Sequence, residues 1–163
     1  KIFEFNRFIN SIYPLTSSTL LSFLSEKFNV TDLGAKFKAP SNNEEISIYI
    51  EKKWYLLKIK KEVIQKLDFK QKLNSQFVSD LILEPILNIK DLRTDQRVEF
   101  ISGELPIQNL MDKVKSTPNG IGICLYPHDI EEIIKIANLS ETMPPKSTWI
   151  EPKLRSAVTI YEY

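Results

Sequence analysis

The stretch TMPPKSTWIEPKLRS, residues 142–156, gathers the side chains best suited to hold an anion. Lysine and arginine supply positive charge, and serine and threonine hydroxyls supply further hydrogen-bond donors. Pro144 and Pro145 precede these donors and restrict the backbone to few conformations. Such a segment could hold a phosphate or carboxylate without a glycine-rich loop. Its candidate ligand-binding residues are Lys146, Ser147, Thr148, Lys153 and Arg155.

The same stretch has a plainer interpretation. It could be a stiff crossover into a final strand, with Trp149 packed beneath it. In that case the prolines and the tryptophan would suffice, and the charged and hydroxyl side chains could be any polar residues. The sequence leaves both interpretations open.

A second group of charges lies in DLRTDQR, residues 91–97, where acids and arginines alternate. Arg93 or Arg97 could turn into a cleft and clamp an anion with two parallel hydrogen bonds. The alternative is a solvated ladder of ion pairs, each worth about 0–1 kcal/mol. Arg93 and Arg97 therefore join the candidate ligand-binding residues.

The remaining reactive side chains have weaker support. Structural zinc sites use several Cys and His ligands, and this chain has one of each, so we predict no metal site. Cys124 lies in the apolar run IGICLY, where we expect an inert core thiol. His128 follows Pro127 at a helix start, where we expect an exposed side chain; the alternative is a ligand contact or proton transfer.

Composition narrows the class of protein. A chain of 163 residues fits one domain with a substantial core, and 42% apolar with 26% charged residues is typical of globular proteins. A net charge of +1 gives no reason to expect nucleic acid or an anionic membrane as a partner. No apolar run approaches the ~20 residues of a membrane helix. A single cysteine favours a reducing compartment, so we expect a cytoplasmic protein.

The elements that must position these residues indicate an α+β domain. ISIYI and WYLLKIK flank a short charged turn and predict an antiparallel hairpin. Further along, the patterns alternate as strand (RVEFI), helix from Pro106, strand (IGICLY), helix capped by Asp129, and strand (AVTIYEY). This β-α-β-α-β alternation implies some parallel pairing. We therefore predict a mixed sheet.

The first residues, KIFEFNRFI, begin directly in a strand-like alternation without an initiator Met. This start indicates that residues 1–163 are a single domain and the C-terminal fragment of a longer protein. A missing N-terminal half would then be its natural partner. Apolar surface left open beside the first strand would favour self-association into a homodimer.

Three stretches, FNRFI, LEPILNIKDLRTDQRVEFISG and MPPKSTWIEPKLRS, resemble the conserved prokaryotic family catalogued as domain of unknown function number 1015. The resemblance covers essentially the whole chain and corresponds to the C-terminal portion of that family. Full-length members look about twice as long and carry an Asp-Gly-His-His-Arg motif before the region where this chain begins. That motif is similar to one in ParB-like and sulfiredoxin-like nucleotide-binding folds, some of which include free-serine kinases.

The resemblance implies that several polar residues occupy motif positions, although no established role attaches to them. They are Asn6, Arg7, Arg93, Thr94, Asp95, Arg97, Lys146, Ser147, Thr148, Lys153 and Arg155. Arg7 thereby completes the set of candidate ligand-binding residues. At His128 the resemblance leads us to expect a small hydroxyl residue, which argues against a catalytic histidine.

Three functions follow from these observations. The leading one is a basic, hydroxyl-rich loop that completes, with the missing N-terminal half, a site for a small anionic or phosphorylated ligand. The second is a structural or dimerisation domain without a ligand site. The third is part of a ParB-like small-molecule kinase of the serine type; the resemblance implies a nucleotide as cofactor of the full-length protein, and the fragment alone would be inactive.

Overall fold

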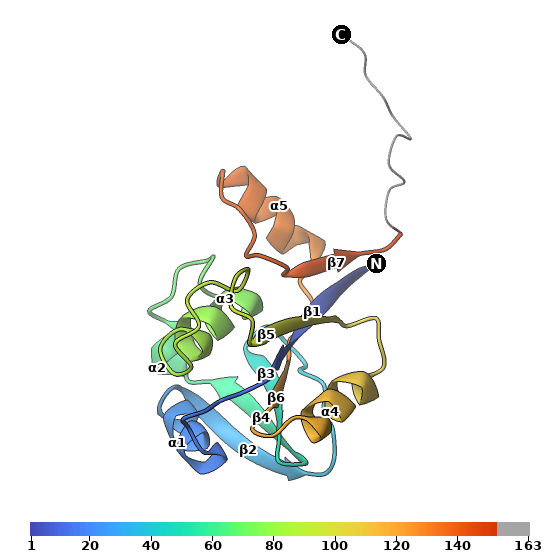
Figure 1. Ribbon diagram of the computed structural model, residues 1–163. Helices are drawn as coiled ribbons and strands as arrows, with labels where there is room; N and C mark the ends of the chain where they lie inside the picture. The colour runs from blue at the N-terminus through green and yellow to red at the C-terminus, as the bar shows by residue number, and fades with distance from the viewer. Residues whose placement is uncertain (153–163) are drawn as a thin grey trace.

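The computed structural model describes residues 1–152 and shows helices packed on one antiparallel sheet (Figure 1). The predicted α+β class is confirmed. The strands are β1 (Ile2–Ile9), β2 (Phe28–Gly34), β3 (Glu45–Ile50), β4 (Lys53–Ile59), β5 (Val98–Ser102), β6 (Ile121–Cys124) and β7 (Thr148–Ile150). They follow the order β2-β4-β3-β6-β1-β5, and β7 pairs with the N-terminal part of β1.

The helices lie on both faces of this sheet. They are α1 (Ser17–Lys27), α2 (Lys61–Ile64), α3 (Asn74–Val78), the π-helical turn η1 (Ser79–Leu83), α4 (Ile107–Ser116) and α5 (Ile130–Asn138). The larger core packs α1, α3 and η1 on one face, and the smaller packs α4 on the other. Alternation along β1 sends Ile9 into the larger core and Phe8 into the smaller. Gly122 allows α4 to pack closely, because a Cβ there would lie 2.8 Å from Leu110.

The predicted hairpin is confirmed as β3 and β4. Its turn consists of Glu51 and Lys52, which have φ angles of 47° and 64°. Two successive residues with positive φ make the turn whose twist matches that of the strands it joins. The strongly apolar β3 is buried along its whole length, because it lies between β4 and β6 in the middle of the sheet.

The expected parallel pairing is not found, since every strand pairing in residues 1–152 is antiparallel. The physical reason is the insertion of β1 between β5 and β6. Both strands run antiparallel to β1, so they are parallel to each other but are not neighbours. Together with α4 they form a split β-α-β unit. The final strand predicted from AVTIYEY lies outside the described residues.

The stretch expected to be a loop contains strand β7, which pairs with β1 at Ile2, Phe3 and Glu4. Exposed apolar side chains lie nearby, on α5 and β7: Ile130, Ile134, Leu139 and Ile150. In Figure 1, α5 and β7 stand at the same end of the molecule as the N-terminus. Across residues 1–152, each helix is too short or too polar to span a lipid bilayer.

Candidate functional site

The ring of Phe100, on β5, is shared by two cations that the sequence singled out. The guanidinium carbon Cζ of Arg7 lies 4.5 Å from the ring centroid, and Nζ of Lys146 lies 5.3 Å from it. Arg7 is the register partner of Phe100 across β1 and β5, so both side chains project from one face of the sheet. Lys146 reaches the ring from the turn that precedes β7.

Arg7 is buried, and no acid among residues 1–152 forms an ion pair with it. Its residue is only 1% exposed. Nη1 donates a hydrogen bond to the Phe5 carbonyl, whereas Nε and Nη2 have no partner among the described residues. Burial lowers the pKa of Arg7 to about 9, so the guanidinium still carries its charge at neutral pH. A buried charge with unsatisfied donors is costly, and it is a feature that structure alone reveals.

Further aromatic side chains lie on the same face of the sheet as this arginine. Phe5 packs edge-on against Phe100, with centroids 6.2 Å apart, and against Trp149 at 5.6 Å. Trp149 is the register partner of Phe3 across β7 and β1, so it lies on the same face as Arg7. The segment that leads into β7 therefore covers the arginine end of the sheet.

A cavity of about 400 Å³ opens beside Phe100. Its lining residues are Leu92, Arg93, Asp95, Val98, Glu99, Phe100, Pro145 and Lys146. The two acids are already paired, Asp95 with Arg97 at 2.7 Å and Glu99 with Lys113 at 2.7 Å. Arg93 and Lys146 make no ion pair within residues 1–152. Among the described residues that line the cavity, the charged side chains without an ion pair are therefore the two cations.

Arg97 does not line this cavity and has a structural role. Nε and Nη2 both donate to the Asp95 carboxylate, at 3.0 and 2.7 Å, and Nη1 and Nη2 also bond the carbonyls of Leu87 and Asn88. The bonds from Arg97 lower the pKa of Asp95, and that carboxylate raises the pKa of Arg97. Of the two arginines in this stretch, Arg97 is thus held in an ion pair, whereas Arg93 has no ion-pair partner in the described part of the chain.

Ser147 and Thr148, the other described candidates of residues 142–156, do not line the cavity. Ser147 is buried, and Thr148 is in β7 opposite Glu4. Lys146 is exposed with a φ of 46°, an uncommon backbone conformation for a side chain of that size. Lys153 and Arg155 lie outside the described residues. Within the described part of this segment, the sequence-predicted donor that lines the cavity is Lys146.

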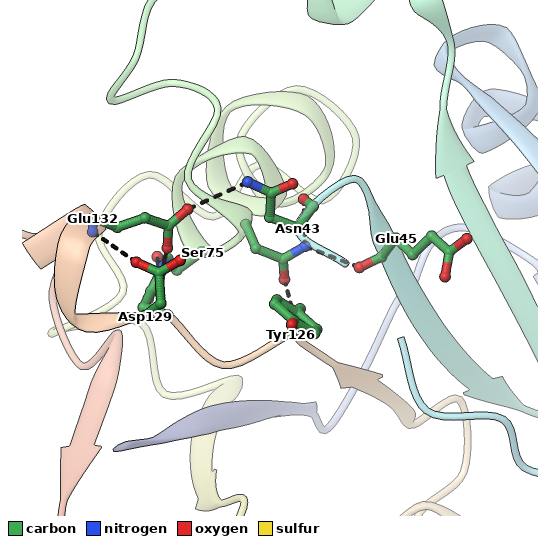
Figure 2. Close-up of polar contacts among 8 residues, drawn as sticks. Asn43, Glu45, Ser75, Tyr126, Asp129 and Glu132 are labelled. Atoms are coloured by element: carbon green, nitrogen blue, oxygen red, sulfur yellow. Dashed lines mark hydrogen bonds and ion pairs between the residues drawn. The ribbon is translucent and has the colours of Figure 1, made fainter. Parts of the chain in front are cut away.

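A second polar cluster was missed by sequence reasoning. His128 is only 4% exposed, so the expectation of an exposed side chain is wrong. Its Nε2 lies 3.0 Å from Oγ of Ser75, and its Nδ1 lies 2.9 Å from Oε2 of Glu132. Figure 2 shows Ser75, Asp129 and Glu132 gathered where α5 begins, beside α3. The imidazole is buried because the connection from β6 to α5 passes the start of α3.

Asn74, the neighbour of Ser75, joins three segments. Its Nδ2 donates to the carbonyls of Asn43 and Glu45 at 3.0 and 2.9 Å, and its Oδ1 accepts from the Tyr126 amide at 3.1 Å (Figure 2). Asn43 in turn donates to Glu132 at 3.3 Å. Asn74 is fully buried, so these bonds satisfy polar atoms that water cannot reach.

The order hydroxyl, imidazole, carboxylate is the one that activates nucleophilic serines. Here, however, both Ser75 and His128 are buried, at 1% and 4% exposed, so a substrate has no direct access to the hydroxyl. Burial tends to raise the pKa of Glu132, but bonds from His128 and Asn43 and the charge of His128 lower it overall. The cluster therefore fastens α5 to the start of α3.

Cys124 is buried, as predicted. Burial, with a smaller contribution from the charge of Glu4, raises the pKa of its thiol well above the usual range, which suppresses the reactive thiolate. In residues 1–152, His, Cys, Asp and Glu side chains form no group of three placed to hold a metal ion.

Comparison with known proteins shows a likeness of fold. Neither a family model nor a curated protein sequence matches the chain. Among solved structures, it is similar to two mutants of a free serine kinase, one in complex with AMP and one with ADP. Each has a TM-score of 0.51 and 17% sequence identity, over 91% of this chain and 53% of the kinase chain. The chain thus shares a fold with about half the length of that kinase.

Proposed function

We propose that this chain is the anion-binding half of a small-molecule phosphotransfer protein. In this proposal the cavity beside Phe100 holds a phosphate group of a nucleotide or of a phosphorylated substrate. One observation carries it: Arg93 and Lys146 line a single cavity without ion pairs in residues 1–152, while the two acids there are paired. The likeness of fold to a kinase solved with AMP and ADP supports it.

The chemistry of phosphoryl transfer fits these residues. Such reactions depend chiefly on positioning and on neutralising charge at the phosphate oxygens. Lys146 supplies a compact charge, and Arg93 supplies a planar fork that matches two oxygens. Leu92, Val98 and Pro145 supply the apolar part of the cavity lining. We assign no acid–base residue to this half, so the isolated chain is expected to bind but not to transfer phosphate.

Calorimetric titration with ADP, ATP and inorganic phosphate tests the proposal. Lys146→Ala and Arg93→Ala should each weaken phosphate-dependent binding by ~1.5–3 kcal/mol, the scale of a hydrogen bond to a charged group. Lys115→Ala is the matched control, because that lysine lies on α4 and pairs with Asp112. Absence of binding by the unchanged protein, or equal binding by all three variants, would contradict the proposal.

A dimerisation domain is the second candidate. The exposed apolar side chains of Ile130, Ile134 and Leu139 on and beside α5 favour it, since such groups mark association surfaces. Sedimentation analysis of the purified chain distinguishes the two candidates. A dimer that Ile134→Glu converts to a monomer, without any anion binding, would support this alternative.

A further inference from the structure

One side of the buried Arg7 guanidinium, formed by Nε and Nη2, makes no hydrogen bond to the described residues. Among the described residues, the buried side-chain nitrogens and oxygens without a hydrogen-bond partner are Nε and Nη2 of Arg7 and Nε1 of Trp54. Only Arg7 among these carries a charge. Nη1 is held by the Phe5 carbonyl, which fixes the group in place and leaves the Nε–Nη2 edge unused.

The geometry of that edge is informative. Nε–H and Nη2–H point in parallel from one side of the planar group, which is the arrangement that binds two oxygens of one carboxylate or phosphate. Within residues 1–152, no acid forms an ion pair with Arg7. Its register neighbours, Phe100 on β5 and Ile123 on β6, cannot accept a hydrogen bond through their side chains. The described part of the chain therefore offers this two-donor edge no acceptor.

A second cation approaches the same ring. The Arg7 guanidinium carbon and Nζ of Lys146 lie 4.5 and 5.3 Å from the Phe100 centroid, and neither side chain forms an ion pair within residues 1–152. An oxyanion bound to the Nε–Nη2 edge would satisfy the two donors and place a negative charge at this end of the sheet.

We propose that Arg7 is the inner anchor for an oxyanion group, a carboxylate or phosphate, carried by a small molecule. The inference deepens the proposed function and rests on it for the entry route through the Phe100 cavity. Arg7 is buried and does not line the Phe100 cavity, so the protein must move locally to admit the group. We place that movement in the turn containing Pro145 and Lys146, because both residues line the cavity. The positive φ of Lys146 lowers the cost of that movement, since the residue leaves an unfavourable conformation.

Thermal unfolding of the 163-residue chain tests this role with inorganic phosphate, acetate and chloride at equal ionic strength. Arg7→Met keeps an unbranched apolar stem and removes the charge and the hydrogen-bond donors. In chloride we expect Arg7→Met to melt at a higher temperature than the unchanged protein, because replacing an uncompensated buried charge by an apolar group is stabilising. Phosphate or acetate should raise the melting temperature of the unchanged protein and not that of Arg7→Met beyond the general effect of the salt.

Two further variants keep the test decisive. Arg97→Met removes an arginine that is already paired, so it should lower the melting temperature in every salt and retain the anion-specific rise. Arg7→Lys keeps the charge without the fork, and should need about tenfold more anion for half the rise. If Arg7→Met does not fold, Arg7→Lys provides the test in its place. The anion that raises the melting temperature, phosphate or acetate, identifies the chemical group that Arg7 binds.

The outcomes also separate this inference from the proposed function. If Arg7→Met melts lower in chloride, as Arg97→Met does, and the unchanged protein shows no anion-specific rise, Arg7 is structural and the inference is wrong. If the rise survives Arg7→Met but is lost in Lys146→Ala, the proposed function stands and the inference fails. If Arg7→Met loses the anion-specific rise in melting temperature while Lys146→Ala leaves nucleotide binding unchanged, the inference is supported and the proposed function is not.

Discussion

Arg7 and Phe100 are register partners on β1 and β5, and the guanidinium carbon lies 4.5 Å from the ring centroid. Lys146 approaches the same ring from a segment more than 40 residues further along the chain. The ring thus gives two cations a favourable surface while neither has an acid partner within residues 1–152. This arrangement concentrates positive charge at the end of the sheet where β1 meets β5 and β7.

Phe100→Leu tests that arrangement. Loss of the ring removes the surface for both cations, and we expect a fall of about 1–3 kcal/mol in the free energy of unfolding. Denaturation in urea measures it. Phe69→Leu is the matched control, because a single lysine, Lys135, lies 3.8 Å from that ring. An equal loss in both variants would show that the pairing of cations at Phe100 has no special effect.

Asp95→Asn should lower the free energy of unfolding by ~1–2 kcal/mol at neutral pH, because it breaks the two-pronged bond from Arg97. Since the pKa of Asp95 is lowered in the folded state, its contribution is complete above the unfolded value near 3.9 and is lost as the pH falls further. Stability curves of the two proteins should therefore converge in acid. The exposed carboxylate of Asp112 is the control, and Asp112→Asn should cost no more than about 0.5 kcal/mol.

Asn74→Ala should be among the more damaging single substitutions. It leaves the buried Glu45 carbonyl and the partly buried Asn43 carbonyl and Tyr126 amide without the partners that the Asn74 side chain supplies, and the loss of a buried partner costs about 1–3 kcal/mol. Chemical denaturation should show a loss of at least ~2 kcal/mol. Asn109→Ala, on an exposed asparagine of α4, provides the comparison. Similar stability of the two variants would contradict the role given to Asn74.

Glu132→Gln tests the fastening of α5. The pKa of Glu132 is lowered in the folded state, so its bond with His128 contributes fully above the unfolded value near 4.3 and is lost on further acidification. The substitution should lower the free energy of unfolding by ~1–2 kcal/mol at neutral pH. The free energy of unfolding of the variant should also fall less steeply on acidification than that of the unchanged protein. A double-mutant cycle with His128→Ala measures the coupling, and additive effects would show that the two side chains act independently.

Local features of this protein were predictable from sequence because they depend on short-range physical rules. Alternation and turn residues predicted the hairpin β3–β4, helical spacing after Pro106 predicted α4, and Asp129 as a cap predicted the start of α5, where its side chain accepts from the Glu132 amide at 2.8 Å. The apolar surroundings of Cys124 likewise predicted its burial. In each case the deciding interactions lie within a few residues of one another.

Tertiary structure alone decided the features that join distant segments. The insertion of β1 between β5 and β6 replaced the expected parallel pairing, and the register of β1 on β5 placed Arg7 against Phe100, 93 positions away. His128 was expected at the surface, but the path of the chain from β6 to α5 buried it against Ser75. Strand order and register depend on the total apolar area that the whole chain can bury, and no short stretch of sequence carries that sum.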